Sequence, residues 1–454
     1  MRKVPLQVIG VVVLIILGCL DPNAAVRPAA VEYCVRPGAR GAADGSDWEN
    51  AWTEIPETLE RGAVYYLADG TYADCTLDDP EAGVQRITIR KATPEDHGTD
   101  RGWSDSYGDG RAIFGSMCVR SGYWTIDGSR RTSKDSGHGI KLEVSIDPDP
   151  GVSDNHGIVV NAGTGVRVDG IRIEYVEFEG VFGAYPSGDS APTVNGYEHT
   201  NGGDDLYVGY CYFHHFMGPM QRTRGQNRAV YEHNYYRDNR SYPDGPHGDA
   251  IQLWNSENSV IRFNEFQDIE GTAVINLAWD VENIRIYGNT CSYTSDYDEG
   301  GVGNGIASPY DGDVGALYVY NNTMANSPTK MYFSMTGDRV GTDHYCVNNI
   351  WFKCFRESNA AGVDTEEFTH HGHNFVSRSS LLWTYEPADT TKLTTTDPFV
   401  DSAGYDFHLA GPTGPGLDLS TQTWWDPRYD SARDPDGTIR GQDGSWDVGA
   451  YEYP

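Results

Sequence analysis

Val260-Ile261-Arg262-Phe263-Asn264-Glu265-Phe266 is one copy of a short pattern of alternating apolar residues that ends in an asparagine and an apolar or aromatic pair. Further copies are Ile284-Arg285-Ile286-Tyr287-Gly288-Asn289, Leu317-Tyr318-Val319-Tyr320-Asn321-Asn322 and Tyr345-Cys346-Val347-Asn348-Asn349. The turn position falls at residues 176, 211, 234, 264, 289, 322, 349 and 374, in steps of 23 to 35 residues. Strict alternation is typical of strands, and a repeat of this length with variable loops indicates stacked coils.

Asparagine holds six of these eight turn positions: Asn234, Asn264, Asn289, Asn322, Asn349 and Asn374. Asparagine tolerates the left-handed backbone of a tight turn, and its amide can bond the next asparagine of a stack. We therefore predict eight or more stacked coils with these asparagines aligned along one turn.

These repeats resemble the right-handed parallel β-helix superfamily of pectate-lyase-like proteins, which includes exported bacterial polysaccharide lyases. The resemblance implies an all-β solenoid with an N-terminal helical cap and a C-terminal cap. In that family a second short strand, of the form Gly-Ile-x-Leu, precedes each repeat and lines the substrate groove. On this likeness we expect groove strands at residues 139–142, 157–160, 220–224, 249–254, 272–276 and 305–308.

The composition shows no break after the N-terminal segment, so we predict one domain over residues 33–454. Residues 33–109 are assigned to the N-terminal cap and first coils, 110–380 to the coils and 381–454 to the C-terminal cap. A bare solenoid end exposes strand edges and core, so a short amphipathic helix from Trp52 to Arg61 is expected to cover the first coil.

Residues 1–19 have the features of a secretory signal. Met1-Arg2-Lys3 precedes an apolar run from Val8 to Leu17, which is too short to span a bilayer. Ile16-Leu17-Gly18-Cys19 resembles a bacterial lipobox, which predicts lipidation of Cys19; the alternative is cleavage near Ala24-Ala25. We therefore expect an exported protein, either secreted or a periplasmic or cell-surface lipoprotein. Export permits disulfides, and a Cys34–Cys75 pair is left open.

The formal net charge of −32 favours a soluble surface that repels nucleic acid and anionic membranes. The expected partner is a polysaccharide, with membrane contact only through an N-terminal lipid, and the protein is expected to be a monomer. A polyanionic substrate requires a local cationic patch to overcome this global field.

Such a patch is suggested by five arginines between residues 219 and 240: Arg222, Arg224, Arg228, Arg237 and Arg240. Guanidinium groups can bind carboxylates or sulfates of a sugar chain, or pair with acidic residues of neighbouring coils. We predict catalytic roles for Arg222 and Arg224 and substrate-binding roles for Arg228 and Arg240. Two buried unpaired arginines would be costly, so Arg222 and Arg224 are expected to face outward.

The loop that follows the arginines brings His247 and Asp249 to the start of a predicted groove strand. His247 is a candidate acid or base near neutral pH. Asp249, Gln252 and Trp254 are candidate substrate-binding residues, although an aspartate at this place can simply satisfy turn amides. Tyr310 is a further candidate for stacking on sugars. Lys141 is a candidate base, or a solvated strand lysine.

Two further pairs of residues suggest metal ligands. Asp204 and Asp205 could bind Ca²⁺, which takes several oxygen ligands; the alternative is a solvated turn. His214 and His215 are neighbours on one strand, and neighbours on a strand point to opposite faces. On this parity argument zinc binding by the two histidines is not expected.

Three functions fit this pattern. A polysaccharide lyase needs a base for the proton next to a uronate carboxylate and a cation that holds the developing charge. A glycoside hydrolase of the same fold needs two or three carboxylates in the groove, for which Asp204, Asp205 and Asp249 are the candidates. A non-catalytic glycan-binding or surface protein is the third, because fold does not imply function. We favour a lyase that acts on a uronate-containing polysaccharide by β-elimination, with Ca²⁺ as a candidate cofactor.

Overall fold

The computed structural model describes residues 30–145, 155–182, 195–240, 248–270, 273–294, 304–306, 312–327, 338–339, 343–354, 370–376, 392–393, 396–413 and 416–454. Within these ranges the helices are two short 3-10 turns, Asp105–Tyr107 and Leu419–Thr421, and none is long and apolar enough to cross a membrane. The predicted signal, Cys19, His247 and Tyr310 lie outside the described residues. Export and lipidation therefore stay predictions.

Three long parallel sheets make up most of the described chain. Sheet A contains, in stacking order, β1 Glu32–Val35, β2 Val64–Leu67, β5 Ile87–Lys91, β8 Trp124–Asp127, β11 Arg172–Glu174, β15 Tyr207–Gly209, β19 Val230–Glu232, β22 Val260–Arg262, β25 Ile284–Tyr287, β29 Leu317–Tyr320, β32 His344–Val347 and β34 His370–Gly372. Sheet B contains β3 Gly70–Thr71, β6 Ala112–Phe114, β9 Ile140–Glu143, β12 Val176–Glu179, β16 Tyr212–Phe216, β20 Tyr235–Asn239, β23 Glu265–Ile269, β26 Thr290–Ser292, β30 Thr323–Ala325, β33 Ile350–Phe352, β35 Phe375–Val376 and β36 Lys392–Leu393. Sheet C contains β4 Cys75–Leu77, β7 Met117–Val119, β10 His156–Val160, β13 Asn195–His199, β17 Gln221–Arg224, β21 Ile251–Trp254, β24 Ala273–Ala278 and β27 Asn304–Ile306.

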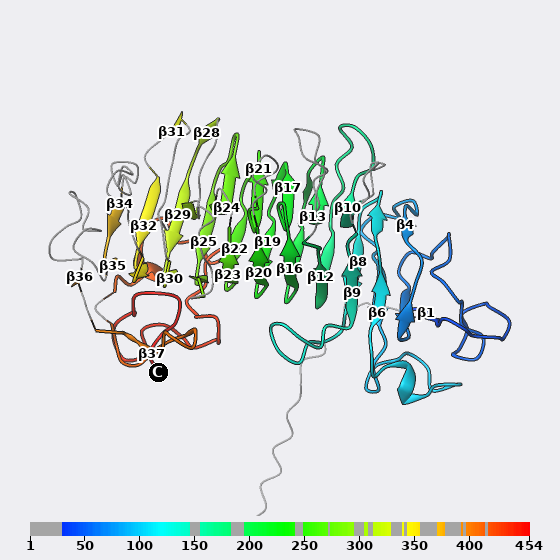
Figure 1. Ribbon diagram of the computed structural model, residues 1–454. Helices are drawn as coiled ribbons and strands as arrows, with labels where there is room; N and C mark the ends of the chain where they lie inside the picture. Colours follow the sequence, from blue (N-terminus) through cyan, green and yellow to red (C-terminus); the bar gives the residue numbers. More distant parts are fainter. Residues whose placement is uncertain are drawn as a thin grey trace, which may run out of the picture.

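Short pairs complete the strands: β14 Gly203–Asp204 with β18 Gln226–Asn227, β28 Asp313–Val314 with β31 Asp338–Arg339, and the antiparallel β37 Phe399–Asp401 with β38 Asp406–Leu409. One coil passes through the three sheets in turn, as in β19, β20 and β21. Each of these strands pairs in parallel with its counterpart one coil later, namely β22, β23 and β24. Repeated along the chain, this register makes a parallel β-helix, which confirms the predicted fold (Figure 1).

Inward side chains of successive coils stack into one core. On sheet B the rings of Phe178 and Phe213 lie 4.4 Å apart, those of Phe213 and Tyr236 4.9 Å, and those of Tyr236 and Phe266 5.0 Å. All four side chains are buried. Strand alternation places every second residue in this core, and the intervening residues face outward.

The predicted asparagine ladder is present in the turn between sheets A and B. The backbone N–H of Asn264 donates to Oδ1 of Asn289 at 2.9 Å, and the Nδ2 of Asn264 donates to the same oxygen at 3.0 Å. The same pair of bonds joins Asn234 to Asn264, and it recurs from Asn289 to Asn322, Asn349 and Asn374. The alignment of the six asparagines is therefore confirmed.

The left-handed residue of this turn is the one before the ladder asparagine, which corrects our explanation of the repeat. Phe263, Asn321 and Asn348 have φ values of 59°, 51° and 57°, whereas the ladder asparagines are outside this region. Residues as large as Phe263 accept this conformation. The asparagines are thus needed for their hydrogen bonds between coils, and their tolerance of left-handed φ is not used.

The predicted N-terminal helix is absent, because Trp52–Arg61 forms turns. Pro56 lies in the middle of this segment and cannot donate a helical hydrogen bond. Side chains satisfy the backbone instead: Leu59 N donates to Asp79 Oδ1 at 2.9 Å and Glu60 N to the Tyr65 hydroxyl at 2.7 Å. The indole of Trp52 packs against Tyr65 at the first coils, with ring centroids 5.9 Å apart.

The C-terminal segment runs back along the outer faces of sheets A and B near the last coils (red in Figure 1). On sheet A, Asp430 accepts from Arg285 Nε at 2.8 Å and from the Tyr320 hydroxyl at 2.7 Å. On sheet B, Phe399 and Phe407 pack in one cluster with Phe352. This segment therefore occupies the outer faces of the two sheets that were not predicted to form the groove.

Candidate functional site

Sheet C contains five of the six predicted groove strands, namely β10, β17, β21, β24 and β27. The sixth, residues 139–142, lies in sheet B as β9, so Lys141 is not part of the groove. Three strands of sheet C were not among the predicted groove strands, namely β4, β7 and β13. The strand β13 is important, because it lies between β10 and β17.

Four polar residues form a row across the outer face of sheet C. Register pairs Glu198 with Arg222, Arg222 with Gln252, and Gln252 with Asn276. Neighbouring strands lie about 4.8 Å apart, so the row presents one polar side chain per coil. Arg222 and Arg224 alternate with the buried Gln221 and Thr223, as the parity argument predicted.

Glu198 is the centre of this row. Its Oε2 accepts from Arg222 Nη2 at 2.7 Å and from Asn195 Nδ2 at 2.6 Å. Nε2 of His156, the first residue of β10, lies 3.6 Å from the same oxygen. The side chains of Glu198 and His156 are each 12% exposed. The carboxylate therefore orients a guanidinium and an imidazole side by side at the surface of the sheet.

Arginine and tryptophan side chains continue the site toward the carboxyl ends of β17 and β21. The Arg224 guanidinium lies 4.7 Å from the centre of the Trp254 ring and 5.3 Å from that of Trp279. The two indoles meet edge to face at 4.3 Å. Arg224 is exposed, and both tryptophans are partly exposed. Two guanidinium groups beside partly exposed indoles suit a sugar that carries a carboxylate.

Asp249 is fully buried and contacts two amides of the row, so it is not an exposed substrate-binding residue as predicted. Its Oδ2 accepts from Gln252 Nε2 at 2.6 Å and from Asn276 Nδ2 at 2.9 Å, and its Oδ1 accepts from Ala273 N at 2.8 Å. Asp249 therefore orients the two amides of the row and satisfies a turn. Among the described residues, Gln252 Oε1 and Asn276 Oδ1 accept no hydrogen bond.

The five arginines of residues 219–240 do not form one anion site. Arg222 and Arg224 face outward from sheet C, whereas Arg237 belongs to sheet B and pairs with Asp238 at 3.1 Å. Arg240 follows β20 and stacks on Phe182 at 4.5 Å. Successive strands of a coil face different sides, so a run of arginines in sequence is dispersed around the solenoid.

Asp204 and Asp205 are held by arginines in the turn between sheets C and A. Asp204 pairs with Arg167 at 2.8 Å and with Arg228 at 2.9 Å, and Asp205 pairs with Arg228 at 2.8 Å. Arg228 therefore pairs with acidic residues and is not free to bind substrate. The same ion pairs occupy the two predicted calcium ligands. On the outer face of sheet C, Arg222 lies between Glu198 and the free amide oxygens. Neither of these two places therefore offers Ca²⁺ the six to eight oxygen ligands that it takes.

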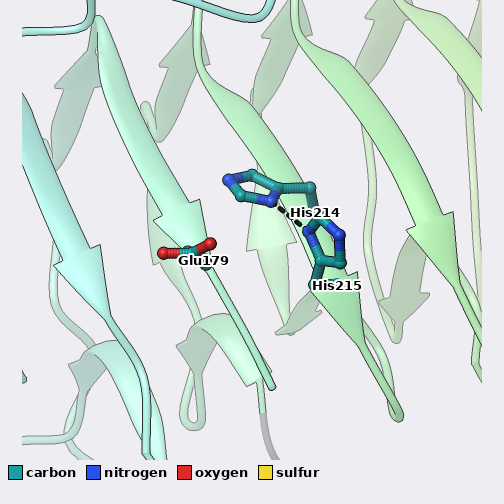
Figure 2. Close-up of side chains that lie close together, drawn as sticks. All are labelled: Glu179, His214 and His215. Carbon is teal, nitrogen blue, oxygen red and sulfur yellow. Dashed lines mark hydrogen bonds between the residues drawn. The ribbon is translucent and has the colours of Figure 1, made fainter. Parts of the chain in front are cut away.

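A second group of ionisable residues occupies the outer face of sheet B. Lys141 Nζ lies 2.8 Å from Glu143 Oε1 and 2.5 Å from Glu179 Oε2. Burial lowers the pKa of Lys141, but these two carboxylates outweigh it and raise the pKa overall. Lys141 is thus a cation at neutral pH. Beside it, Glu179, His214 and His215 come together (Figure 2).

Signals for the site residues that were not predicted, His156 and Glu198, are weak in the sequence. His156 and Glu198 follow residues 146–154 and 183–194, which carry no repeat pattern. The strand Asn195–His199 places a polar residue, His199, in a buried position, so apolar alternation is broken. That Glu198 lies beside Arg222 can be recognised only once the register between the coils is known.

Comparison with known proteins gives structural likeness alone. No family model matches the sequence, and no curated protein matches it. Among solved structures, a PL6 family polysaccharide lyase from Pseudopedobacter saltans is 12% identical, with a TM-score of 0.41, covering 81% of this chain and 95% of that chain. Pectate lyase Pel9A is 13% identical, with a TM-score of 0.40, covering 94% of this chain and 98% of that chain. We assign the fold from the strand register and transfer no residue role from either protein.

Proposed function

We propose that this protein is an exported polysaccharide lyase, secreted or lipid-anchored, that binds a uronate-containing polysaccharide along the outer face of sheet C. The observation that carries the proposal is the contact of Arg222 with Glu198, beside His156 and the stacked Arg224. These residues bring cationic donors, a candidate base and indole rings together in one place.

The proposed reaction is a β-elimination. Arg222 and Arg224 bind the uronate carboxylate, whose charge increases as the proton on C5 leaves. His156 accepts that proton, because its imidazole lies beside the guanidinium groups and Glu198 lies 3.6 Å from its Nε2. The electron pair of the C5–H bond forms the C4=C5 double bond, the C4–O bond breaks, and the leaving oxygen takes up a proton from solvent water. No step is routed through calcium.

A hydrolase is less well supported by the same face. Hydrolysis of a glycosidic bond uses two carboxyl groups about 5 to 10 Å apart on either side of the scissile bond. Among the described residues, Asp249 is buried under the amides, while Asp204 and Asp205 are paired with arginines. The predicted hydrolase set is therefore not brought together.

Incubation with a panel of acidic polysaccharides tests the proposal, because elimination creates an unsaturated uronate that absorbs ultraviolet light. We expect product with at least one member of the panel. Arg222→Ala and His156→Ala should each lower kcat/KM by about 100-fold or more. Thermal unfolding checks that each variant remains folded.

Arg172→Ala is the matched control. Arg172 is also an outward arginine, paired with Glu174 at 2.5 Å and stacked on Tyr207 at 3.9 Å, but it belongs to sheet A. It should keep wild-type activity. If the protein binds a polysaccharide but forms no unsaturated product, elimination is contradicted and glycan binding is the function that remains. Full activity in both Arg222→Ala and His156→Ala would show that the active site does not lie at Glu198.

A further inference from the structure

Three metal-ligating residues meet on the outer face of sheet B, away from the proposed polysaccharide site. One ligand atom each from Glu179, His214 and His215 lies within 4.8 Å of the other two. Glu179 ends β12 and is the register partner of His214 in β16. Figure 2 shows the two imidazoles turned toward one another with the Glu179 carboxylate on the adjacent strand. The set therefore joins two neighbouring coils.

The backbone explains why both histidines reach the same place. His215 has φ = 62°, so β16 leaves the regular strand conformation at this residue and the usual alternation is broken. Asp238 and Asp268, at the corresponding positions of β20 and β23, have φ values of 52° and 56°. The kink is thus part of the coil geometry. At His215 the strand alternation that would place neighbouring histidines on opposite faces does not hold.

A second and independent feature is the carboxylate behind His214. His214 is buried, and its Nε2 lies 3.5 Å from Oε1 of Glu177. Arg111 Nη1 lies 2.9 Å from Oε2 of the same carboxylate. Histidines that ligate metals usually donate their other ring N–H to a carboxylate, which fixes the tautomer. Glu177 stands where such a partner would lie, although the 3.5 Å contact is not a hydrogen bond. On the other side of the ring, Nδ1 of His214 lies 2.5 Å from Nδ1 of His215.

We propose that Glu179, His214 and His215 bind a divalent transition-metal ion that prefers nitrogen ligands, with Zn²⁺ as the probe. Two imidazoles and one carboxylate make three protein ligands, which leaves a fourth position for water. Lys141 Nζ lies 2.5 Å from Glu179 Oε2, so it competes with the ion for this carboxylate. Binding displaces Lys141 toward Glu143 and breaks the hydrogen bond between the two Nδ1 atoms. The proton of that bond moves to the opposite nitrogen of its imidazole.

Titration of the chelator-treated full-length protein with Zn²⁺ tests the site. We expect one ion per chain in calorimetry, and a visible absorption band when Co²⁺ replaces Zn²⁺. His215→Ala and Glu179→Gln should each lower the Zn²⁺ affinity about tenfold or more. Lys141→Met should raise the affinity, because it removes the cation that competes for Glu179.

His97→Ala is the control for unspecific binding by a histidine beside an acid. His97 lies 2.9 Å from Asp100, far from β12 and β16 in the coil stack. This variant should bind Zn²⁺ like the wild type. Because the ion joins β12 to β16, Zn²⁺ should also raise the thermal midpoint of the wild type and of His97→Ala, and leave that of His215→Ala unchanged.

Equal Zn²⁺ affinity in the wild type and His215→Ala would overturn the proposal. Displacement of Zn²⁺ by an equal concentration of Ca²⁺ would also overturn it, because that result indicates binding to the acidic surface and not to a nitrogen-rich site. Neither result depends on whether the protein cleaves a polysaccharide.

Discussion

Asn289 shows at the scale of a single residue how one coil is held to the next. Its Nδ2 donates to Ile261 O at 2.9 Å and to Asn322 Oδ1 at 3.0 Å, and its Oδ1 accepts from Asn264 N at 2.9 Å. Asn289→Ala leaves the buried N–H of Asn264 without its acceptor and removes the bonds that Asn289 makes to Ile261 O and Asn322 Oδ1. We expect the free energy of unfolding to fall by about 2 to 5 kcal/mol in chemical denaturation.

Asn258→Gly is the comparison for Asn289→Ala. Asn258 is half-buried, donates to Asn227 Oδ1 at 3.0 Å, accepts from Asn283 Nδ2 at 2.6 Å and has φ = 52°, a conformation that glycine accepts. Because water can replace these partners at a half-buried position, its loss should cost less than that of Asn289, about 1 kcal/mol. Equal losses in the two variants would show that burial adds nothing to the contribution of an asparagine that joins two coils.

Residues of the candidate site were predictable from the sequence to the extent that strand parity fixes them. The outward direction of Arg222 and the partial exposure of Trp254 follow from alternation within one strand. Contacts between strands do not follow from alternation. Glu198 lies beside Arg222 because of the register between two neighbouring coils, which the sequence does not specify. The cluster at His215 was missed for a different reason, since one left-handed residue reverses the parity on which the argument rested.

At the scale of the element, the asparagine repeat was sufficient to predict the coils, because each ladder position marks the same turn. An isolated short strand is harder to place, since all three sheets share a period of two residues. The strand containing Lys141 was therefore assigned to the groove and lies in sheet B. The helix predicted at Trp52–Arg61 is absent. Amphipathic spacing does not take account of Pro56, or of the side chains that bond the backbone in place of helical hydrogen bonds.

The end of β13 gives a prediction about pH. His199 is buried; its Nε2–H donates to Gly202 O at 3.0 Å, and its Nδ1 accepts from the Tyr197 hydroxyl at 3.2 Å. Burial lowers its pKa from 6.5 to about 3. Below pH 6.5 the unfolded chain therefore binds more protons than the folded one. The stability contributed by neutral His199 is complete above that pH and is lost as the pH falls toward the folded pKa.

His199→Gln removes this titration while an amide can still donate to Gly202 O. Between pH 7.5 and 5.5 the wild type should lose about 1.4 kcal/mol of unfolding free energy that the variant does not lose. Urea denaturation at each pH measures the difference in slope, which is independent of any constant cost of the substitution. Parallel pH profiles would mean that folding does not lower the pKa of His199.

At the scale of the whole molecule, the net charge of −32 opposes the proposed polyanionic substrate, whereas Arg222 and Arg224 attract it locally. The two effects act over different distances. The Debye length falls from about 30 Å at 0.01 M salt to about 10 Å at 0.1 M, so moderate salt screens the distant carboxylates before it screens arginines in direct contact with the substrate. Near 1 M, with a Debye length of about 3 Å, the contacts themselves are weakened.

We therefore expect the affinity for a uronate oligosaccharide to rise severalfold between 0.01 and about 0.1 M salt and to fall again toward 1 M. Calorimetric titration across this range measures the curve. A neutral oligosaccharide of the same length should show no rise, because it carries no charge for the acidic surface to repel. If affinity falls steadily from the lowest salt, the contacts of the two arginines dominate at every distance, and the global charge of the protein does not control access to sheet C.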